Sequence, residues 1–217
     1  VKQEAVISAY DADDLYKIPA MMHEEGLHGF QARDATVFPQ AIALAATWDP
    51  ELVERVYEVV AREIRARGAR QALTPVVDVA RDPRWGRIEE TYGEDPYLSA
   101  QMGVVFVQGL QGDDPQYLKL VATPKHYAVH SGPEPDRHRF DAVVSERDLQ
   151  ETYLPAFRAT VTEADAQSVM CAYNRTNGDP CCSSEFLLQE TLRDAWGFDG
   201  HVVSDCGAVN DLHEGHK

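Results

Sequence analysis

The chain has 217 residues, enough for one substantial core but fewer than the roughly 250 residues typical of a closed eight-stranded β/α barrel. Its formal charge of −16 disfavours nucleic acid and anionic lipid as partners, because an acidic surface repels phosphate groups. No apolar run approaches the roughly 20 residues that span a bilayer, so we expect no membrane insertion.

The first part of the chain predicts two short strands and one long helix. The apolar stretches 18–22 and 41–46 are both candidates for strands. Asp49 is placed to cap the helix, Pro50 takes its first position, and Gly68 is placed to end it. Apolar side chains recur on one face of this helix, as packing against a core requires.

Four later segments are short, β-branched and mostly without polar alternation, which is typical of parallel strands buried on both faces. They are residues 72–79, 119–123, 168–171 and 201–204. Helices are expected between them. One opens at Asp95-Pro96, and a second starts at the capping-box residue Ser145 and is interrupted by Pro155. A third starts at Ser184 and closes at Gly197.

The alternation of strands and helices predicts an α/β fold made of βαβ units. We favour most of a TIM-type (β/α)8 barrel, incomplete in this chain, over a doubly wound open sheet. Residues 1–217 would then form a single barrel domain.

Polar side chains follow the expected strands, and the carboxyl ends of the strands are where a β/α barrel builds its chemistry. These groups are residues 23–29, 81–87, 124–127, 170–174 and 204–206. Their contents suit a sugar, since charged groups bind hydroxyls and Trp85, Tyr127 and Tyr173 offer rings to the apolar faces of a pyranose. Each group alone has a simpler explanation: the arginines could form surface ion pairs, and Asp205 could cap a helix. The coincidence of five such loops favours a site.

The cysteines and histidines argue against a metal site, and we expect no metal or other cofactor. Cys171, Cys181, Cys182 and Cys206 lack the paired spacing of a zinc site. A disulfide from Cys171 to Cys181 or Cys182 and buried free thiols stay open as equal alternatives. The two histidines of residues 23–28 are five positions apart, whereas zinc ligation from one helix face requires four.

Together, these motifs resemble the family 3 glycoside hydrolases, in particular the β-xylosidases and β-glucosidases. The matching stretches are residues 25–29, 38–40, 82–87, 90–96, 125–127, 170–174 and 197–205, which extend over nearly the whole chain. The resemblance implies a retaining, exo-acting β-D-glycosidase with Asp205 as its nucleophile. In such an enzyme a carboxylate attacks the anomeric carbon, and water then opens the covalent glycosyl-enzyme with net retention.

The resemblance also implies residues that bind an oligosaccharide substrate. Arg87, Lys125 and His126 would hold sugar hydroxyls, and Asp82 would be their structural partner. Positive charge on these neighbours would favour the ionised form of the Asp205 carboxyl group.

Met170 and Tyr173 match positions that line the same subsite. Glu25 stands in a Glu-x-Leu-His-Gly motif that looks like the β-xylosidase branch, whereas many β-glucosidases have an aspartate there. The extra methylene would fill space that glucose needs for its hydroxymethyl group, so β-xylosyl is favoured over β-glucosyl. A β-N-acetylglucosaminidase is a weaker alternative, because the loop that contains His138 lacks that branch's Pro-Gly and Ser.

The general acid/base of the resembling branches is a glutamate from an α/β sandwich domain that follows the barrel. Retention needs two carboxyl groups roughly 5 Å apart, so we expect this chain to be a fragment whose acid/base lies in a missing C-terminal domain. A catalytically incomplete, sugar-binding or scaffold barrel would have the same sequence. No leader sequence is recognisable at the start of the chain, and a periplasmic or secreted location is favoured only because polysaccharides lie outside the cell.

Overall fold

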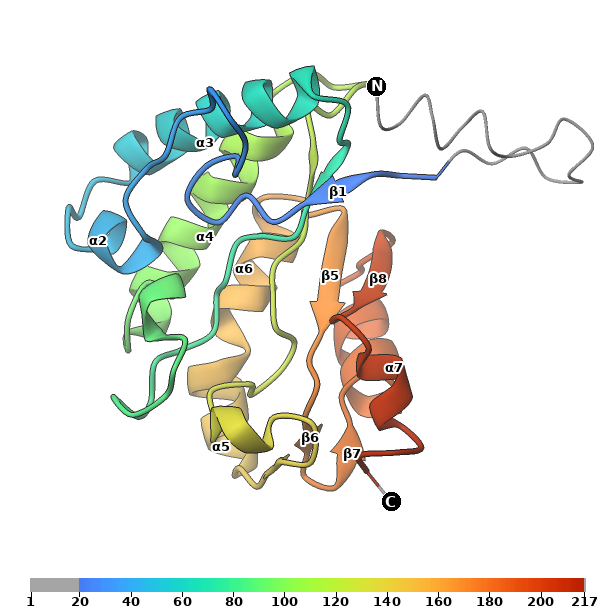
Figure 1. Ribbon diagram of the computed structural model, residues 1–217. Coiled ribbons are helices and arrows are strands. Elements are labelled where there is room, and N and C mark those ends of the chain that lie inside the picture. The colour runs from blue at the N-terminus through green and yellow to red at the C-terminus, as the bar shows by residue number, and fades with distance from the viewer. Residues whose placement is uncertain (1–19, 217) are drawn as a thin grey trace, which may run out of the picture.

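The structure is a computed structural model that describes residues 20–216. Its parallel strands follow one another in space as they do in the chain (Figure 1). They are β1 (His23–Glu24), β2 (Gln71–Ala72), β3 (Val121–Ala122), β5 (Ser168–Cys171) and β8 (His201–Ser204). β1, β2 and β3 form one sheet, and β5 pairs with β8. The bridge between Tyr127 and Cys171 links the segment after β3 to β5.

Parallel strands in chain order with helices outside them are the arrangement of a β/α barrel. Within residues 20–216 no further strand pairs with the outer edge of β1 or of β8, so the described part of the barrel is open. The carboxyl ends of these strands lie on one side, and the loops that follow them are therefore neighbours.

Three helices pack beside the strands: α3 (Pro50–Ala66), α4 (Pro96–Gln111) and α6 (Pro155–Thr162). α4 lies between α3 and α6 (Figure 1). The predicted caps are confirmed, since the Asp49 carboxylate accepts the Leu52 N–H at 3.0 Å and the Asp95 carboxylate accepts the Leu98 N–H at 2.8 Å. Gly68, with φ of +99°, follows the end of α3 as expected.

Two glycines of α4 let this helix approach its neighbours closely. A Cβ atom on Gly103 would lie 2.8 Å from a Val77 methyl group, and one on Gly109 would lie 2.5 Å from the Glu54 carbonyl oxygen. The first contact fixes α4 against the segment that follows β2, and the second fixes it against α3. Larger side chains here would push the helix layer away from the strands.

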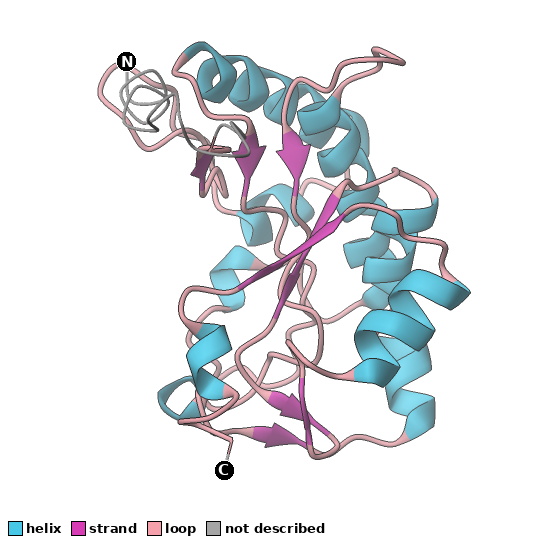
Figure 2. Ribbon diagram, turned by 90° about the vertical axis from the view of Figure 1, so that its right-hand side faces the viewer, coloured by secondary structure: helices cyan, strands magenta, loops and turns pink. Residues whose placement is uncertain are grey.

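Smaller elements complete the described residues: α2 (Ala41–Ala45), η1 (Ile88–Glu90), η2 (Glu134–Asp136), β4 (Asp141–Ala142), α5 (Glu146–Asp148), η3 (Leu149–Tyr153), β6 (Arg175–Thr176), β7 (Asp179–Pro180), η4 (Phe186–Ala195) and α7 (Ala208–Asp211). Strands β4, β6 and β7 form a small separate sheet at the lower end of the molecule (Figure 2). Ser145 caps α5, and Pro155 separates η3 from α6, as the sequence predicts. None of the helices described is long and apolar enough to cross a membrane.

Some strand predictions are wrong in type or length. Residues 41–46 contain the helix α2, because a short apolar run has no strand period and alanine is a strong helix former. Residues 18 and 19 lie outside the described residues, and the first strand begins at His23. In the segment 72–79 the ladder stops after Ala72, where Pro75 has no N–H to donate, and resumes only as a bridge at Val76.

Candidate active site

Asp205 follows the last residue of β8, at the end of the strand where the other polar loops gather. Its backbone N–H donates to the Cys171 carbonyl oxygen at 3.2 Å, which ties it to β5. Its Oδ1 accepts the Cys206 N–H at 2.7 Å. The residue is 7% exposed, and its Oδ2 has no hydrogen-bond partner in the described part of the chain. One carboxylate oxygen is thus held in place and the other is unengaged.

His126 lies between two carboxyl groups. Its Nδ1 is 2.7 Å from Asp78 Oδ2, which also accepts the His126 backbone N–H at 3.0 Å. Its Nε2 is 3.5 Å from Asp205 Oδ2. Burial lowers the pKa of His126 well below 6.5, and burial raises the pKa of Asp78 to about 7. We therefore assign a neutral imidazole that donates from Nδ1 to Asp78 and whose Nε2 lone pair lies on the side of Asp205.

This assignment corrects the expectation that His126 is a cation beside Asp205. It also leaves two buried acceptors, His126 Nε2 and Asp205 Oδ2, without a donor in residues 20–216. A buried acceptor without a donor costs free energy, and a ligand rich in hydroxyl groups would supply the missing donors. The hydroxyl groups of a sugar are donors of the kind that these two acceptors lack.

Lys125 is also buried, and it points toward Glu25. Its Nζ donates to Glu25 Oε2 at 2.7 Å, while its side chain is 4% exposed and that of Glu25 is 54% exposed. Lys125 is therefore the buried partner of this ion pair, and Glu25 is the solvent-exposed one. The sequence prediction that these two residues share a site is consistent with this contact.

Arg87 is held by Glu90 through two parallel hydrogen bonds, from Nε to Oε1 at 2.9 Å and from Nη2 to Oε2 at 2.8 Å. Both side chains are 17% exposed, so this is not a surface pair. Asp82, in contrast, pairs with Arg84, whose side chain is 88% exposed.

The expectation that Asp82 is the structural partner of the three substrate-binding residues is therefore wrong. Arg87 pairs with Glu90, Lys125 with Glu25, and His126 with Asp78. Asp82 belongs to an exposed ion pair of the ordinary kind.

Tyr173 is buried beside these residues, with its ring centroid 6.0 Å from that of His130 and 4.6 Å from that of His138. Burial raises the pKa of its hydroxyl group, and the negative charge of Asp205 raises it further, so the phenol stays neutral beside the carboxylate. Met170 is 1% exposed and lies in β5, where it pairs with Val203 of β8. Of the rings proposed as stacking surfaces, Tyr127 is fully buried, and its hydroxyl donates to the Leu187 carbonyl oxygen, which is a structural role.

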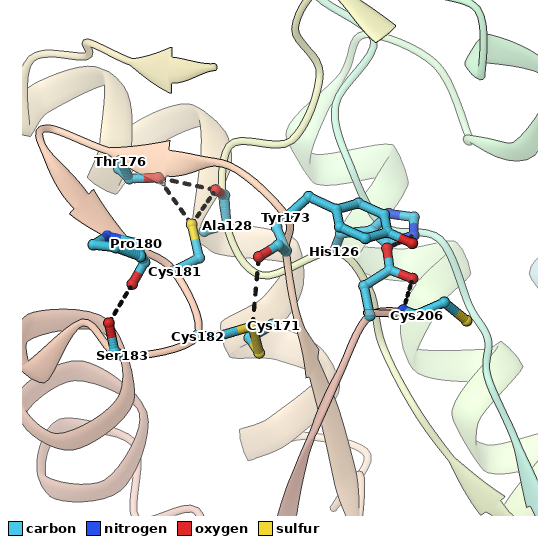
Figure 3. The surroundings of a disulfide bond; sticks show 12 residues. His126, Ala128, Cys171, Tyr173, Thr176, Pro180, Cys181, Cys182, Ser183 and Cys206 are labelled. Atoms are coloured by element: carbon cyan, nitrogen blue, oxygen red, sulfur yellow. Dashed lines mark hydrogen bonds and ion pairs between the residues drawn. A yellow bond between two sulfur atoms is a disulfide. The ribbon is translucent and has the colours of Figure 1, made fainter. Parts of the chain in front are cut away.

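A disulfide joins Cys171 to Cys182, which decides between the alternatives that the sequence left open. It closes the loop that carries Tyr173 (Figure 3). Cys181 is a buried free thiol and Cys206 an exposed one.

Sequence reasoning missed Asp78 and Glu90 as parts of the site. Asp78 had a signal, because it is the one charged residue in the apolar run 76–79 and a buried charge in a strand needs a partner. Glu90 stands three positions after Arg87, a spacing at which side chains on one helical turn meet.

Several known proteins are similar to this chain. A xylan 1,4-β-xylosidase of Xylanibacter ruminicola is 49% identical over 211 residues, covering 89% of this chain and 24% of that protein. A β-xylosidase of Formosa agariphila is 42% identical over 214 residues, covering 94% of this chain and 30% of that protein. The solved structure of a β-glucosidase from Erythrobacter marinus is 38% identical with a TM-score of 0.91, covering 99% of this chain and 28% of that one. The chain thus spans less than a third of the length of each.

The structural similarity confirms the TIM-type β/α architecture that the sequence predicts. The glycosyl hydrolase family 3 N-terminal domain matches residues 1–217, which is the entire chain. The chain therefore belongs to glycosyl hydrolase family 3.

Proposed function

We propose that the protein containing this chain is a retaining, exo-acting β-D-glycosidase that removes terminal β-xylosyl or β-glucosyl residues from oligosaccharides, with Asp205 as nucleophile. The observation that carries the proposal is the unengaged Oδ2 of Asp205, which lies 3.5 Å from His126 Nε2 in a buried site. A carboxylate oxygen that no protein donor occupies is available to attack an anomeric carbon.

The two oxygens of Asp205 would have different tasks. The Cys206 N–H at Oδ1 holds the carboxylate and stabilises its charge, while Oδ2 forms the bond to the sugar. Breaking the glycosidic bond gives a glycosyl ester on Oδ2, and water later opens it with net retention of configuration. Neutral His126 would accept a hydrogen bond from a sugar hydroxyl group at Nε2. The cations Lys125 and Arg87 would donate hydrogen bonds to hydroxyl oxygens.

The leaving group needs a proton, and we propose that its acid is a glutamate in an α/β sandwich domain outside this chain. The resemblance to the β-xylosidases and β-glucosidases supports this, as does the small share of the relatives' length that the chain covers. The two carboxyl groups would have to lie roughly 5 Å apart. If the protein at its natural length bound xylo-oligosaccharides without turning them over, the alternative of a non-catalytic scaffold would hold instead.

We favour β-xylosyl over β-glucosyl because Glu25 pairs with Lys125 and is itself 54% exposed, so its extra methylene would occupy space that the hydroxymethyl group of glucose needs. The names of the xylosidase relatives agree with this preference. We do not favour an aminosugar substrate, since His138 hydrogen bonds to Asp211 through Nδ1 and accepts from Arg137 Nε at Nε2. Neither ring nitrogen is then free for proton transfer.

The test is hydrolysis of nitrophenyl β-xyloside and β-glucoside by the protein at its natural length, compared with its Asp205→Ala variant. We expect kcat to fall by about 10⁴-fold or more. Asp199→Ala is the matched control, because Asp199 belongs to the same sequence motif but is exposed to solvent. Normal turnover by the Asp205→Ala variant would refute the proposal.

A further inference from the structure

His130 is a buried histidine that the proposed mechanism does not use. It is 3% exposed and lies on the loop after β3, between the residues of the site. Its ring packs near those of His126, Trp85 and Tyr173, with centroids 4.6, 6.0 and 6.0 Å away. We propose that His130, itself oriented by Asn174, is a positioning residue that fixes the Arg87 guanidinium for sugar binding. This inference rests on the proposed function of the site.

The orientation of the Asn174 amide can be read from its neighbours. Its Nδ2 lies 2.9 Å from the carbonyl oxygen of Arg175, 3.2 Å from that of Val129 and 3.3 Å from that of Ala128. Carbonyl oxygens only accept, so the atom facing them must be the NH₂ group. The Asn174 Oδ1 therefore points the other way, toward His130.

This orientation fixes the tautomer of His130. Its Nδ1 is 3.3 Å from Asn174 Oδ1, an atom that can only accept, so Nδ1 carries the proton. The Nε2 atom then has a free lone pair and faces Arg87 Nη1 at 3.4 Å. Burial lowers the pKa of His130 to about 4, and the charge of Arg87 lowers it further, so the ring is neutral at neutral pH.

The two partners hold Arg87 from different sides. Glu90 takes the N–H groups at Nε and Nη2, and His130 takes one at Nη1. A guanidinium group has five N–H donors, so two are left for substrate hydroxyls. If Glu90 were the only partner, Nη1 of Arg87 would lack a fixed acceptor. The guanidinium group would then be less precisely oriented for hydrogen bonds to the substrate.

The first test reads the tautomer without using activity. The natural-length protein is labelled with ¹⁵N-imidazole histidine, and long-range ¹H–¹⁵N correlation spectra are recorded at pH 7. The His130 signal is identified by its loss in the His130→Gln variant. We expect a neutral ring with the proton on Nδ1. A proton on Nε2 would overturn the proposal, because Nε2 could then no longer accept from Arg87.

The second test is kinetic. His130→Phe keeps a ring but removes the acceptor, and we expect kcat/KM on nitrophenyl xyloside to fall about 10- to 100-fold, the range for a lost hydrogen bond with one charged partner. His130→Gln, which can place an oxygen near Nε2, should recover most of this loss. In an Arg87→Ala background, His130→Phe should cost less than about threefold. His201→Phe, at the opposite end of β8, is the control and should match the wild type.

The outcomes separate the two proposals. An equal loss in both backgrounds would show that His130 acts independently of Arg87, and no loss at all would show that it does not position the guanidinium. Either result overturns the inference while Asp205→Ala still reports on the nucleophile. Melting temperatures show which variants fold. If His130→Phe does not fold, the tautomer measured for the wild-type ring decides whether the proposal stands.

Discussion

Asp78 offers the sharpest test of how the site is supported, because one of its oxygens accepts two hydrogen bonds from the same residue. Asp78 Oδ2 takes the His126 ring N–H at 2.7 Å and the His126 backbone N–H at 3.0 Å, and the Asp78 side chain is 2% exposed. Asp78→Asn keeps an oxygen for both donors, whereas Asp78→Ala leaves both buried and unpaired. Both variants remove the negative charge. The difference between their free energies of unfolding therefore measures what the acceptor oxygen contributes.

Each unpaired buried donor costs about 1 to 3 kcal/mol, and two of them give about 2 to 6 kcal/mol. We therefore expect the free energy of unfolding of Asp78→Ala to lie at least about 2 kcal/mol below that of Asp78→Asn. Urea unfolding at pH 7, followed by tryptophan fluorescence, measures the difference. Equal stabilities would refute the reasoning, because Asp78 Oδ2 would then not be what satisfies His126.

Three further predictions concern the pKa of Asp78, the disulfide and the side chain of Glu25. The pKa of Asp78 is raised from 3.8 to about 7, so its stabilising contribution is present below pH 4 and is lost as the pH rises through 7. Relative to the wild type, Asp78→Asn should gain stability over that range by at most about 1.4 kcal/mol per pH unit, and a constant difference in urea unfolding would contradict this. Cys182→Ser opens a disulfide with a sequence separation of 11 and should cost about 3 kcal/mol, measured against the wild type under oxidising conditions; under reducing conditions the two should unfold alike. Glu25→Asp shortens the side chain by one methylene and should raise the glucoside-to-xyloside ratio of kcat/KM roughly tenfold, whereas an unchanged ratio would remove Glu25 as the selector.

The helices were the most predictable part of the fold, because residues next to each helix end in the sequence determine where the helix begins and ends. Asp49 with Pro50 and Asp95 with Pro96 mark two helix starts by capping chemistry that needs no tertiary contact. Residues 41–46 have no such marks, and a short apolar run has no period that separates a helix from a strand, although alanine favours the helix.

Several members of the candidate site were predictable, but Asp78, Glu90 and the pairing of the side chains were not. The order of strands and loops indicated that Lys125, His126 and Asp205 would be neighbours. It could not indicate that His126 bonds to Asp78 instead of Asp82, because the choice depends on burial: Asp78 is buried in the segment after β2, whereas Asp82 lies next to an exposed turn and pairs with Arg84. The protonation of His126 also depends on burial, which the local sequence does not report.

Trapping the glycosyl-enzyme tests the central claim most directly. The natural-length protein is treated with an activated 2-deoxy-2-fluoro-β-xyloside, digested, and examined by mass spectrometry. The account predicts one sugar attached to the peptide that contains Asp205, at Asp205 itself, and no adduct in Asp205→Ala. A stable adduct on any other residue would contradict it.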